Sequence, residues 1–375
     1  MTTRGPRIYL DYNATTPLDP RVRQEMVRAL ELYGNPSSTH WEGRVARSLV
    51  DEARVQVGRL LRCDHRRILF TSGGTEANNL AVLGAVRPLG RGHVVTTAIE
   101  HPAVLNPCRT LEKAGFKITR VPPTRDGIIP AQAVAEAIRS DTVLVSIMMA
   151  NNEIGTLQPI REIAAIAHER HILVHTDAVQ ALGRVPVHVQ ELDVDLLSVS
   201  AHKIYGPKGA GALYCAPGVA LAPLLTGGSH ERGLRAGTEN VPAIHGFGVA
   251  ARLLADEGLP RLKRLRDRLQ AGLSSRSMTI LCPDSPRLPN TVNFYSPSWR
   301  GESMVMAFDL EGFAVSNGSA CSAGVIEPSY VIQALGYNED VARSVIRVSL
   351  GKFTGESEID QFLAAVDKLA SCGGC

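Results

Sequence analysis

The sequence predicts an α/β fold in which a mostly parallel sheet, covered by helices on both faces, is followed by a smaller α+β domain. Between about residues 66 and 200, short β-branched runs alternate with segments of helical periodicity, as in repeated βαβ units. Polar clusters follow the ends of these runs. Because ligands bind at the carboxyl ends of parallel strands, the clusters indicate a functional site at one edge of the sheet.

The alternation can be followed element by element. Helices are expected from Thr75, after Pro102 and over residues 160–170, because apolar side chains recur there with helical spacing. The runs between them are short and rich in valine, isoleucine and threonine, as in strands buried on both faces. The expected strands are ILFTS, HVVTTAI, KITRV, VLVSIMM, ILVHTD and VDLLSVS. The polar clusters are TSGGTEANN at 71–79, EH at 100–101, NNE at 151–153, HTDAVQ at 175–180 and SAHK at 200–203.

The pattern changes around Gly258, where a proline is close and a long arginine-rich helical segment begins. Two short β-type runs, PNTVNFY and IRVSL, come later, and a last helix is expected from Glu356. These features predict a second α+β domain. We expect a large domain over residues 16–258 and a small domain made of residues 1–15 and 259–375.

Composition and charge are those of an ordinary globular chain. The 375 residues are 44% hydrophobic, and the 40 basic and 37 acidic residues are spread along the chain, which argues against a nucleic-acid or membrane surface. No stretch is long and apolar enough to span a membrane, and the first residues lack the apolar core of a signal peptide, so a cytoplasmic location is expected. The seven scattered cysteines are interpreted as reduced thiols.

Lys203 is the candidate for a lysine that reacts with a carbonyl group. It follows the apolar strand LLSVS, whereas the other six lysines lie in polar helices, in a turn or near the chain end. Taken alone, such a lysine is more often a solvated loop residue. Asp177, at the end of ILVHTD, could keep a pyridine nitrogen protonated, and Gln180 could donate to a ring oxygen. Asp177 could equally be the N-cap of a helix over AVQAL.

The run from Ser72 to Glu76 lies between a strand and a helix, where free N–H groups and the positive helix end attract a phosphate. A tight turn capped by Thr75 is the simpler interpretation of the same residues. The chain contains neither GxxxxGK[ST] nor GxGxxG, which argues against nucleoside triphosphates and dinucleotides. Of the phosphate ligands considered, a small phosphorylated cofactor bound near Gly74 and Thr75 remains possible for this turn.

Eleven stretches in order resemble a known family: YLDYNATTP, YGNPSSTH, FTSGGTEANNLA, EHPAVL, NNEIG, HTDAVQALG, SAHKIYGPKGAGALY, HERGLRAGTEN, SNGSACSAG, EPSYV and IRVSLGKFT. They are similar to the fold-type-I pyridoxal-phosphate (PLP) enzymes, and within them to the NifS/IscS-like, group I cysteine desulfurases of the class-V aminotransferase family. The resemblance covers nearly the whole chain. It implies PLP as the cofactor and L-cysteine as the substrate.

The resemblance also assigns roles to particular residues. It places the lysine that holds PLP at Lys203, the partner of the ring nitrogen at Asp177 and a donor to the ring oxygen at Gln180. His101 is expected to stack over the ring and to act in proton transfer, whereas a lone histidine is more often a hydrogen-bonded core residue. These assignments agree with the roles inferred from the strand ends.

Binding of the substrate carboxylate is implied for Arg347, whose guanidinium can grip both oxygens; the alternative for this residue is a surface ion pair. Thr238 is expected to reach the phosphate of the partner subunit, which implies a homodimer with shared active sites. Further cofactor contacts are implied for Gly74, Thr75, Asn152, Ser200 and His202. Further substrate contacts are implied for Asn35 and Asn152.

Cys321 lies in SNGSACSAGVIEPSY, a stretch without periodicity that is interpreted as a mobile loop. The resemblance implies that its thiolate accepts the substrate sulfur as a persulfide while alanine leaves, and that the sulfur then passes to an acceptor or an iron–sulfur scaffold protein. A buried structural role fits Cys63, Cys108, Cys215 and Cys282 better. No metal site is expected, although Cys321 could contact a cluster together with a scaffold partner.

Other activities occur on the same fold. An aminotransferase has no use for the Cys321 loop, whereas a selenocysteine lyase would differ in its substrate. A sulfur carrier without catalysis is argued against by the intact set of Lys203, Asp177, His101 and Cys321. A nicotinamide dehydrogenase is argued against by the missing GxGxxG.

Overall fold

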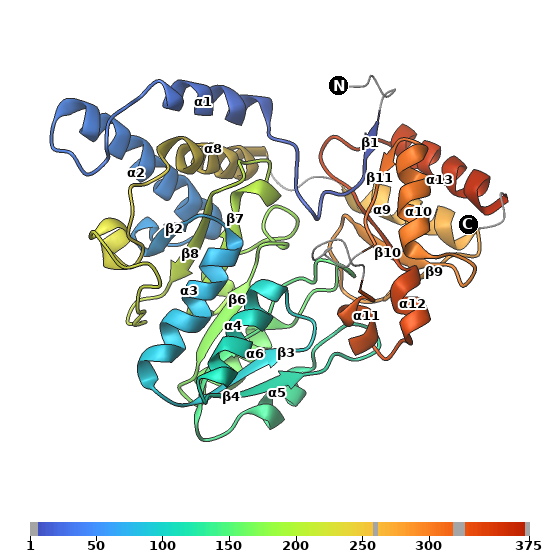
Figure 1. The fold of residues 1–375 in the computed structure, drawn as a ribbon, viewed down its shortest axis with the longest axis horizontal. Helices are drawn as coiled ribbons and strands as arrows, with labels where there is room; N and C mark the ends of the chain where they lie inside the picture. The colour runs from blue at the N-terminus through green and yellow to red at the C-terminus, as the bar shows by residue number, and fades with distance from the viewer. Residues whose placement is uncertain (1–6, 258–261, 318–326, 372–375) are drawn as a thin grey trace.

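The protein is described by a computed structural model over residues 7–257, 262–317 and 327–371. A seven-stranded sheet runs through its larger part (Figure 1). The strand order is β2-β8-β7-β6-β5-β3-β4, and every pair is parallel except the two that β8 makes. The strands are β2 (Ile68–Thr71), β3 (His93–Thr97), β4 (Lys117–Val121), β5 (Thr142–Ser146), β6 (Leu173–Asp177), β7 (Leu196–Ser200) and β8 (Gly211–Cys215).

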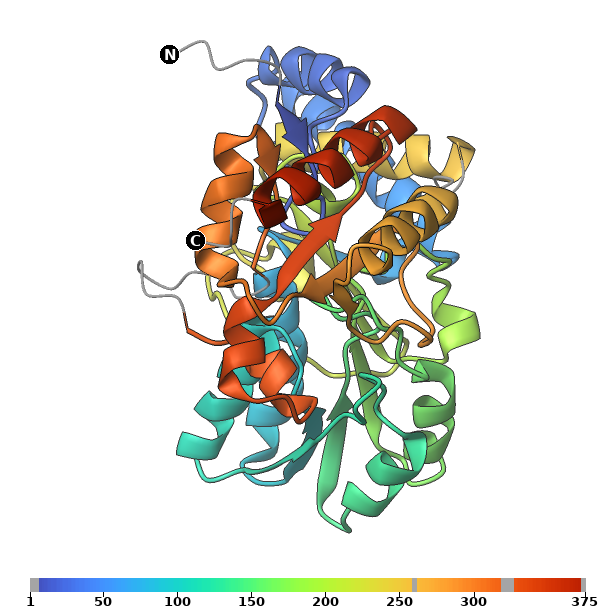
Figure 2. The ribbon, with the colours of Figure 1, turned by 90° about the vertical axis from the view of Figure 1, so that its right-hand side faces the viewer.

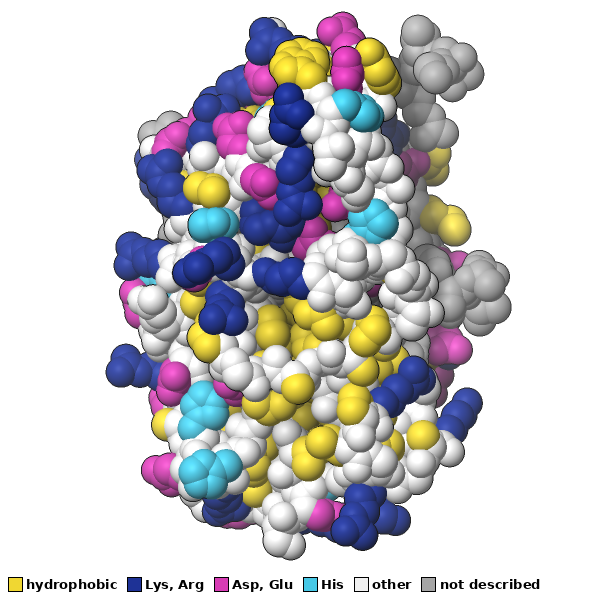
Figure 3. Space-filling model, turned by 90° about the vertical axis from the view of Figure 1, so that its left-hand side faces the viewer, with side chains coloured by type: hydrophobic (Ala, Val, Ile, Leu, Met, Phe, Trp, Pro, Cys, Tyr) yellow, Lys and Arg dark blue, Asp and Glu magenta, His cyan; other side chains and the backbone are white. Residues whose placement is uncertain are grey.

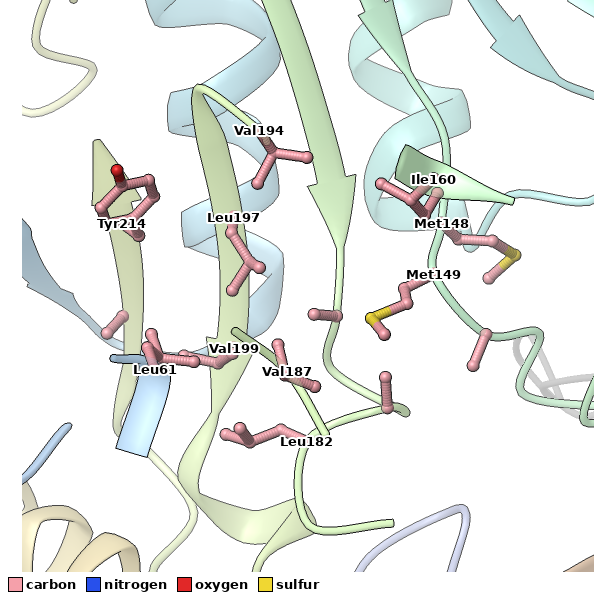
Figure 4. Close-up of a cluster of buried hydrophobic side chains, with 14 of the residues drawn as sticks. Leu61, Met148, Met149, Ile160, Leu182, Val187, Val194, Leu197, Val199 and Tyr214 are labelled. Carbon is pink, nitrogen blue, oxygen red and sulfur yellow. The ribbon is translucent and has the colours of Figure 1, made fainter. Parts of the chain in front are cut away.

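Helices cover both faces of this sheet, and four of its strands are therefore buried along their whole length. Side chains of α3 and α4 pack on one face, against Leu69, Leu144 and Leu196. Side chains of α2, α6 and α8 pack on the other, where Leu197 and Val199 lie (Figure 4). The helices of this part are α1 (Pro20–Leu30), α2 (Trp41–Leu61), α3 (Gly74–Val86), α4 (Pro102–Lys113), α5 (Ala131–Ala137), α6 (Ile160–His168), α7 (Val189–Leu192) and α8 (Val241–Glu257).

A second hydrophobic core lies beside the first, on the right of Figure 1. Its centre contains Phe294, Phe308 and Phe362, all fully buried. Figure 2 shows α9 and α13 lying side by side over a three-stranded antiparallel sheet, β12-β10-β9. The N-terminal strand joins this core because β1 pairs in parallel with β11. The elements are β1 (Ile8–Tyr9), α9 (Leu262–Ser274), β9 (Thr279–Ile280), β10 (Thr291–Tyr295), α10 (Gly301–Leu310), β11 (Phe313–Ala314), β12 (Ile346–Ser349) and α13 (Glu356–Ser371).

Two short helices, α11 (Tyr330–Ala334) and α12 (Glu339–Ser344), come from the second part of the chain but pack on the first core. Val331 and Ile332 of α11 are fully buried in the same cluster as the large sheet. The second part of the chain therefore contributes to both cores, and the expected domain boundary near residue 258 stays a prediction.

The α/β fold expected from the sequence is confirmed, and the expected strands and helices form within a few residues of their predicted limits. The direction of β8 was not anticipated. Only ten residues separate β7 from β8, too few for the helical crossover that a parallel pair needs, so the two strands pair antiparallel. In the described part of the chain, no helix has the length and apolarity to cross a membrane.

Candidate active site

A cavity of about 700 Å³ opens at the carboxyl ends of the central strands, between the two cores. Asp177 ends β6 and Ser200 ends β7, so both reach the cavity from the sheet, while Arg347 reaches it from β12. The structure brings together ten of the residues that the sequence singles out: Gly74, Thr75, His101, Asn152, Asp177, Gln180, Ser200, His202, Lys203 and Arg347.

Lys203 ends a short 3-10 turn, Ala201–Lys203, directly after β7. Its Nζ donates to the carbonyl oxygens of Asn13 and Ala14, the second at 2.8 Å. Burial, with smaller contributions from the nearby Arg184 and Arg347 charges, lowers the pKa of Lys203 to about 7. At neutral pH a large fraction of this amine is therefore uncharged and nucleophilic.

Asp177 is buried and makes two contacts of different kinds. Its Oδ2 accepts a 2.6 Å hydrogen bond from Nδ2 of Asn78, and its Oδ1 accepts from the Val179 N–H at 2.9 Å. The second contact is the local turn that an N-cap would make, but residues 178–182 form a turn and not the helix that the sequence allowed. The carboxylate is thus held in place by Asn78 while it lines the cavity.

Gln180 takes part in a buried network that the sequence interpretation missed. Its Nε2 donates to the Asn13 carbonyl at 2.9 Å, so that Asn13 accepts from both Gln180 and Lys203. Its Oε1 accepts from Arg184 at 2.9 Å, and Arg184 also donates to the Tyr12 carbonyl at 3.0 Å. The motifs YLDYNATTP and HTDAVQALG contain Asn13 and part of this network, but spacing alone says nothing about the contact between them.

One end of the cavity has the features of an anion site. Gly74 begins α3, and no side chain caps the first N–H groups of this helix. A Cβ at Gly74 would lie 2.7 Å from Cγ2 of Val179, so only glycine fits without a shift. The Ser200 hydroxyl is buried and has no hydrogen-bond partner in the described structure. A helix N-terminus beside an unpaired hydroxyl suits the phosphate of a cofactor.

Burial lowers the pKa of both histidines that line the cavity. The pKa of His202 falls to about 4, so this ring is neutral, and its Nδ1 lies 3.1 Å from Oγ1 of Thr15. His101 is the N-cap of α4, where its Nδ1 accepts from the Ala103 N–H at 3.1 Å. This contact leaves Nε2 as the atom that carries the ring proton. His101 can therefore cap α4 and also line the cavity.

Arg347 forms an ion pair, but a buried one. Its Nη2 lies 2.7 Å from Oδ1 of Asp11, and its Nη1 donates to the Asn152 carbonyl at 2.9 Å. Among the residues that the structure describes, Nε of Arg347 and Oδ1 of Asn152 are both buried without a partner. Because a guanidinium has five N–H donors, Arg347 retains donors for a further anion. Asp11, which holds it, was not singled out from the sequence.

These features fit PLP. The cavity combines an amine of lowered pKa, a buried carboxylate, and an unpaired hydroxyl at a helix N-terminus, which match its aldehyde, its ring nitrogen and its phosphate. The groups come from Lys203, Asp177 and Ser200, and Arg347 adds a site for a carboxylate.

Two predicted site residues do not line this cavity, and a third lies outside the described residues. Thr238 lies exposed in the loop before α8, and Asn35 lies exposed between α1 and α2, and neither lines the cavity of its own chain. Cys321 lies outside the described residues. Within the described residues, no group of three or more histidine, cysteine or acidic side chains could hold a metal ion.

Comparison with known proteins agrees with this geometry. The family described as aminotransferase class V matches residues 8–362. The cysteine desulfurase IscS of Dictyoglomus turgidum is 46% identical over 370 residues, which cover 96% of this chain and 94% of that protein. A solved NifS-like protein superposes with a TM-score of 0.91 at 37% identity, covering 98% of this chain and all of its own. A structure described as SspA in complex with cysteine has a TM-score of 0.82 at 37% identity, with 93% and 100% coverage.

Proposed function

We propose that this chain, which belongs to the class-V aminotransferase family, is a PLP-dependent cysteine desulfurase that converts L-cysteine to L-alanine and a Cys321 persulfide. The observation that carries the proposal is the position of Lys203, whose amine of lowered pKa shares one cavity with Asp177 and Arg347. The 46% identity over nearly the full length to a protein named cysteine desulfurase supports this activity over transamination. The relative solved with cysteine supports L-cysteine as the substrate.

The cofactor contacts follow from the cavity. When bound, PLP supplies an electron sink for the charge left on the substrate Cα after proton loss. Lys203 would hold the cofactor, and Asp177, fixed by Asn78, would hold its ring nitrogen. The start of α3 and the Ser200 hydroxyl would hold its phosphate. The remaining contacts come from Gly74, Thr75, His101, Asn152, Gln180, Ser200 and His202.

The same residues account for the handling of the substrate. Arg347 binds its carboxylate with the Nε–H that has no partner in the described structure, and Asn152 adds the N–H group of its side-chain amide. The neutral Lys203 amine removes the Cα proton, and His101, with its ring proton on Nε2, takes part in proton transfer. The Cys321 thiolate bonds to the substrate sulfur as the carbon–sulfur bond breaks, so that cysteine and the thiol yield alanine and the persulfide.

A homodimer explains the two residues that stay outside the cavity. In this proposal Thr238 and Asn35 contribute to the site of the partner subunit. Large hydrophobic side chains are exposed beside Asn35, with Leu30 at 68%, Tyr33 at 88% and Trp41 at 64% of full exposure. Figure 3 shows that hydrophobic side chains also gather at the centre of the face that lies on the left of Figure 1, below a region of mostly charged side chains.

The sulfur then passes from Cys321 to an acceptor, which we propose to be a cytoplasmic protein of iron–sulfur cluster assembly or of another sulfur-using path. Cys321 would contact a cluster only together with such a partner. The name of the Dictyoglomus turgidum relative supports the removal of sulfur from cysteine, and the acceptor is our proposal.

Purified protein supplied with PLP and L-cysteine tests the activity. We expect one alanine for each sulfur released, and loss of sulfur transfer in Cys321→Ser with the cofactor absorbance intact. Cys63→Ser is the matched control, because Cys63 is half-buried just after the end of α2 and burial raises the pKa of its thiol to about 12. Release of a keto acid in place of alanine would indicate an aminotransferase, and a preference for selenocysteine a lyase. Retained desulfuration in Cys321→Ser would exclude the proposed role of this thiol.

A further inference from the structure

Two buried carboxyl groups adjoin the cavity without taking part in the chemistry proposed above. Glu100 precedes His101 and Glu153 follows Asn152, and the two are 0% and 2% exposed. Burial raises the pKa of Glu100 to about 8 and that of Glu153 to about 7. Acidic side chains are rarely buried this completely unless another part of the fold holds them.

The Glu100 carboxyl accepts from the Thr97 hydroxyl at 2.8 Å and from the Met148 N–H at 2.9 Å. The first two residues of the α11 region contact the Glu153 carboxyl and the backbone of Glu100. Oγ of Ser329 donates to Oε2 of Glu153 at 2.6 Å, and the Tyr330 hydroxyl donates to the backbone carbonyl of Glu100 at 2.6 Å. Ser329 is 1% exposed. Burial raises the pKa of the Tyr330 phenol, so it remains a donor throughout the neutral range. One short segment therefore binds both turns that carry cavity side chains.

This segment is itself firmly placed. Val331 and Ile332 are fully buried in the core under the large sheet, and the Ser329 side chain caps α11 by accepting from the Ile332 N–H at 3.2 Å. In the sequence, Ser329 stands eight residues after Cys321, within the EPSYV motif to which the proposed chemistry gives no role. The segment thus connects the cavity to the part of the chain that contains Cys321, the thiol proposed to take the substrate sulfur.

We propose that Ser329 and Tyr330 are positioning residues, which dock the chain following Cys321 onto the turns that present Asn152 and His101. The inference rests on the proposed function and adds two residues to it. Tyr330 holds the peptide immediately before His101, and through it the ring that acts in proton transfer. Ser329 holds Glu153, and through it Asn152, whose carbonyl is a partner of Arg347.

The two contacts predict different kinetic effects. Loss of the Tyr330 hydroxyl leaves the Glu100 carbonyl without its donor and frees the His101 turn, which lowers kcat more than it changes KM. Loss of the Ser329 hydroxyl frees the Asn152 turn beside Arg347, which weakens binding of the substrate carboxylate and raises KM. Substitution of a residue that served only stability would change neither kcat nor KM of the folded protein.

The test compares steady-state alanine formation by holoenzyme variants, each with a matched control. We expect Tyr330→Phe to lower kcat about tenfold with KM within about twofold, and Ser329→Ala to raise KM for cysteine about tenfold. Tyr295→Phe removes a hydroxyl without a hydrogen-bond partner in the described structure, and Asn338→Ala removes the N-cap of the neighbouring α12. Both controls should retain wild-type constants. Ser329→Thr, which keeps the hydroxyl, should retain the wild-type KM.

The outcomes separate this inference from the function on which it rests. If the wild-type protein forms no alanine from cysteine, the proposed function fails. If the wild type is active but Tyr330→Phe and Ser329→Ala behave like their controls, only the positioning role fails. Should Ser329→Ala not fold, Glu153→Leu removes the acceptor with little change in volume, and a wild-type KM in this variant would overturn the role of the Ser329 contact.

Discussion

Two buried arginines of this fold differ in how completely their polar atoms are hydrogen-bonded. At the free edge of β2, Arg54 forms a two-point ion pair with Glu231 at 2.6 and 2.8 Å and donates to the Ile68 carbonyl, while Glu231 also accepts from the Phe70 N–H. These contacts satisfy the exposed side of an edge strand with groups from the same chain. In the cavity, Arg347 is paired with Asp11 but keeps an unpartnered Nε.

The difference extends to the neighbours of each arginine. The cavity also contains the unpartnered hydroxyl of Ser200 and the unpartnered Oδ1 of Asn152, whereas the Arg54 cluster uses its donors and acceptors internally. Buried polar groups without partners cost free energy unless something else supplies the contact. Burial alone therefore does not mark the site. The cavity differs from the Arg54 cluster in that four of its lining residues carry buried polar atoms without a partner in the described structure: Asn78, Asn152, Ser200 and Arg347.

The sharpest test of the comparison is Lys203→Met. We expect activity to fall by at least about 1000-fold, because the residue holds the cofactor and takes the Cα proton. Folding should not weaken, since the change removes an amine whose charged form is disfavoured by burial. Alanine release and thermal unfolding of the cofactor-free protein measure the two effects. A large loss of stability would show that Lys203 is part of the framework.

Arg54→Met should do the opposite and destabilise the fold. Breaking a buried ion pair leaves Glu231 uncompensated, at a cost of about 3–5 kcal/mol in the free energy of unfolding. Arg54→Met combined with Glu231→Gln should recover most of this loss, because the amide keeps an acceptor for the Phe70 N–H and carries no charge. Urea unfolding of the two variants gives the difference. Equal stability of the single and double variants would contradict the account of this edge.

Ser198 and Ser200 offer a matched pair on one strand. Both are buried, but Oγ of Ser198 lies 3.0 Å from Nε2 of His175, whereas Oγ of Ser200 has no partner. We expect Ser198→Ala to lower stability by about 1 kcal/mol and Ser200→Ala to leave the cofactor-free protein unchanged or slightly more stable. Ser200→Ala should instead weaken PLP binding about fivefold, measured by titration of cofactor absorbance. If Ser200→Ala lowered stability and left PLP binding unchanged, Ser200 would not bind the phosphate.

The smallest expected effect is a pH dependence of cofactor loading. The pKa of Lys203 is lowered to about 7, and only its neutral amine reacts with an aldehyde, so loading at pH 7 should be about twofold slower than at pH 8. Between pH 7 and 10.5 the unfolded chain binds more protons at this lysine than the folded chain, so its contribution to stability rises with pH there. Stopped-flow absorbance measures loading. A rate that rises about tenfold for each pH unit from 6 to 8 would mean that the amine keeps its ordinary pKa.

Much of the cavity could be predicted because its residues follow strand ends in short motifs. Lys203, Asp177 and Ser200 come directly from such ends, and the topology brings them together. Asn78 and Asn13 were missed as partners of these residues, although both lie in recognised motifs, because a contact across 99 or 190 residues leaves no local pattern. Ser329 and Tyr330 were missed for the same reason.

The sequence by itself determined the alternation of strands and helices, the chemical character of the strand ends and the family, since each is written in local periodicity and residue type. Only the tertiary structure decided which polar groups are paired and which are left open. It also lowered the pKa of Lys203 and placed α11 against the turns before His101 and after Asn152. Burial and hydrogen bonding depend on packing between distant segments, and the order of residues does not state that packing.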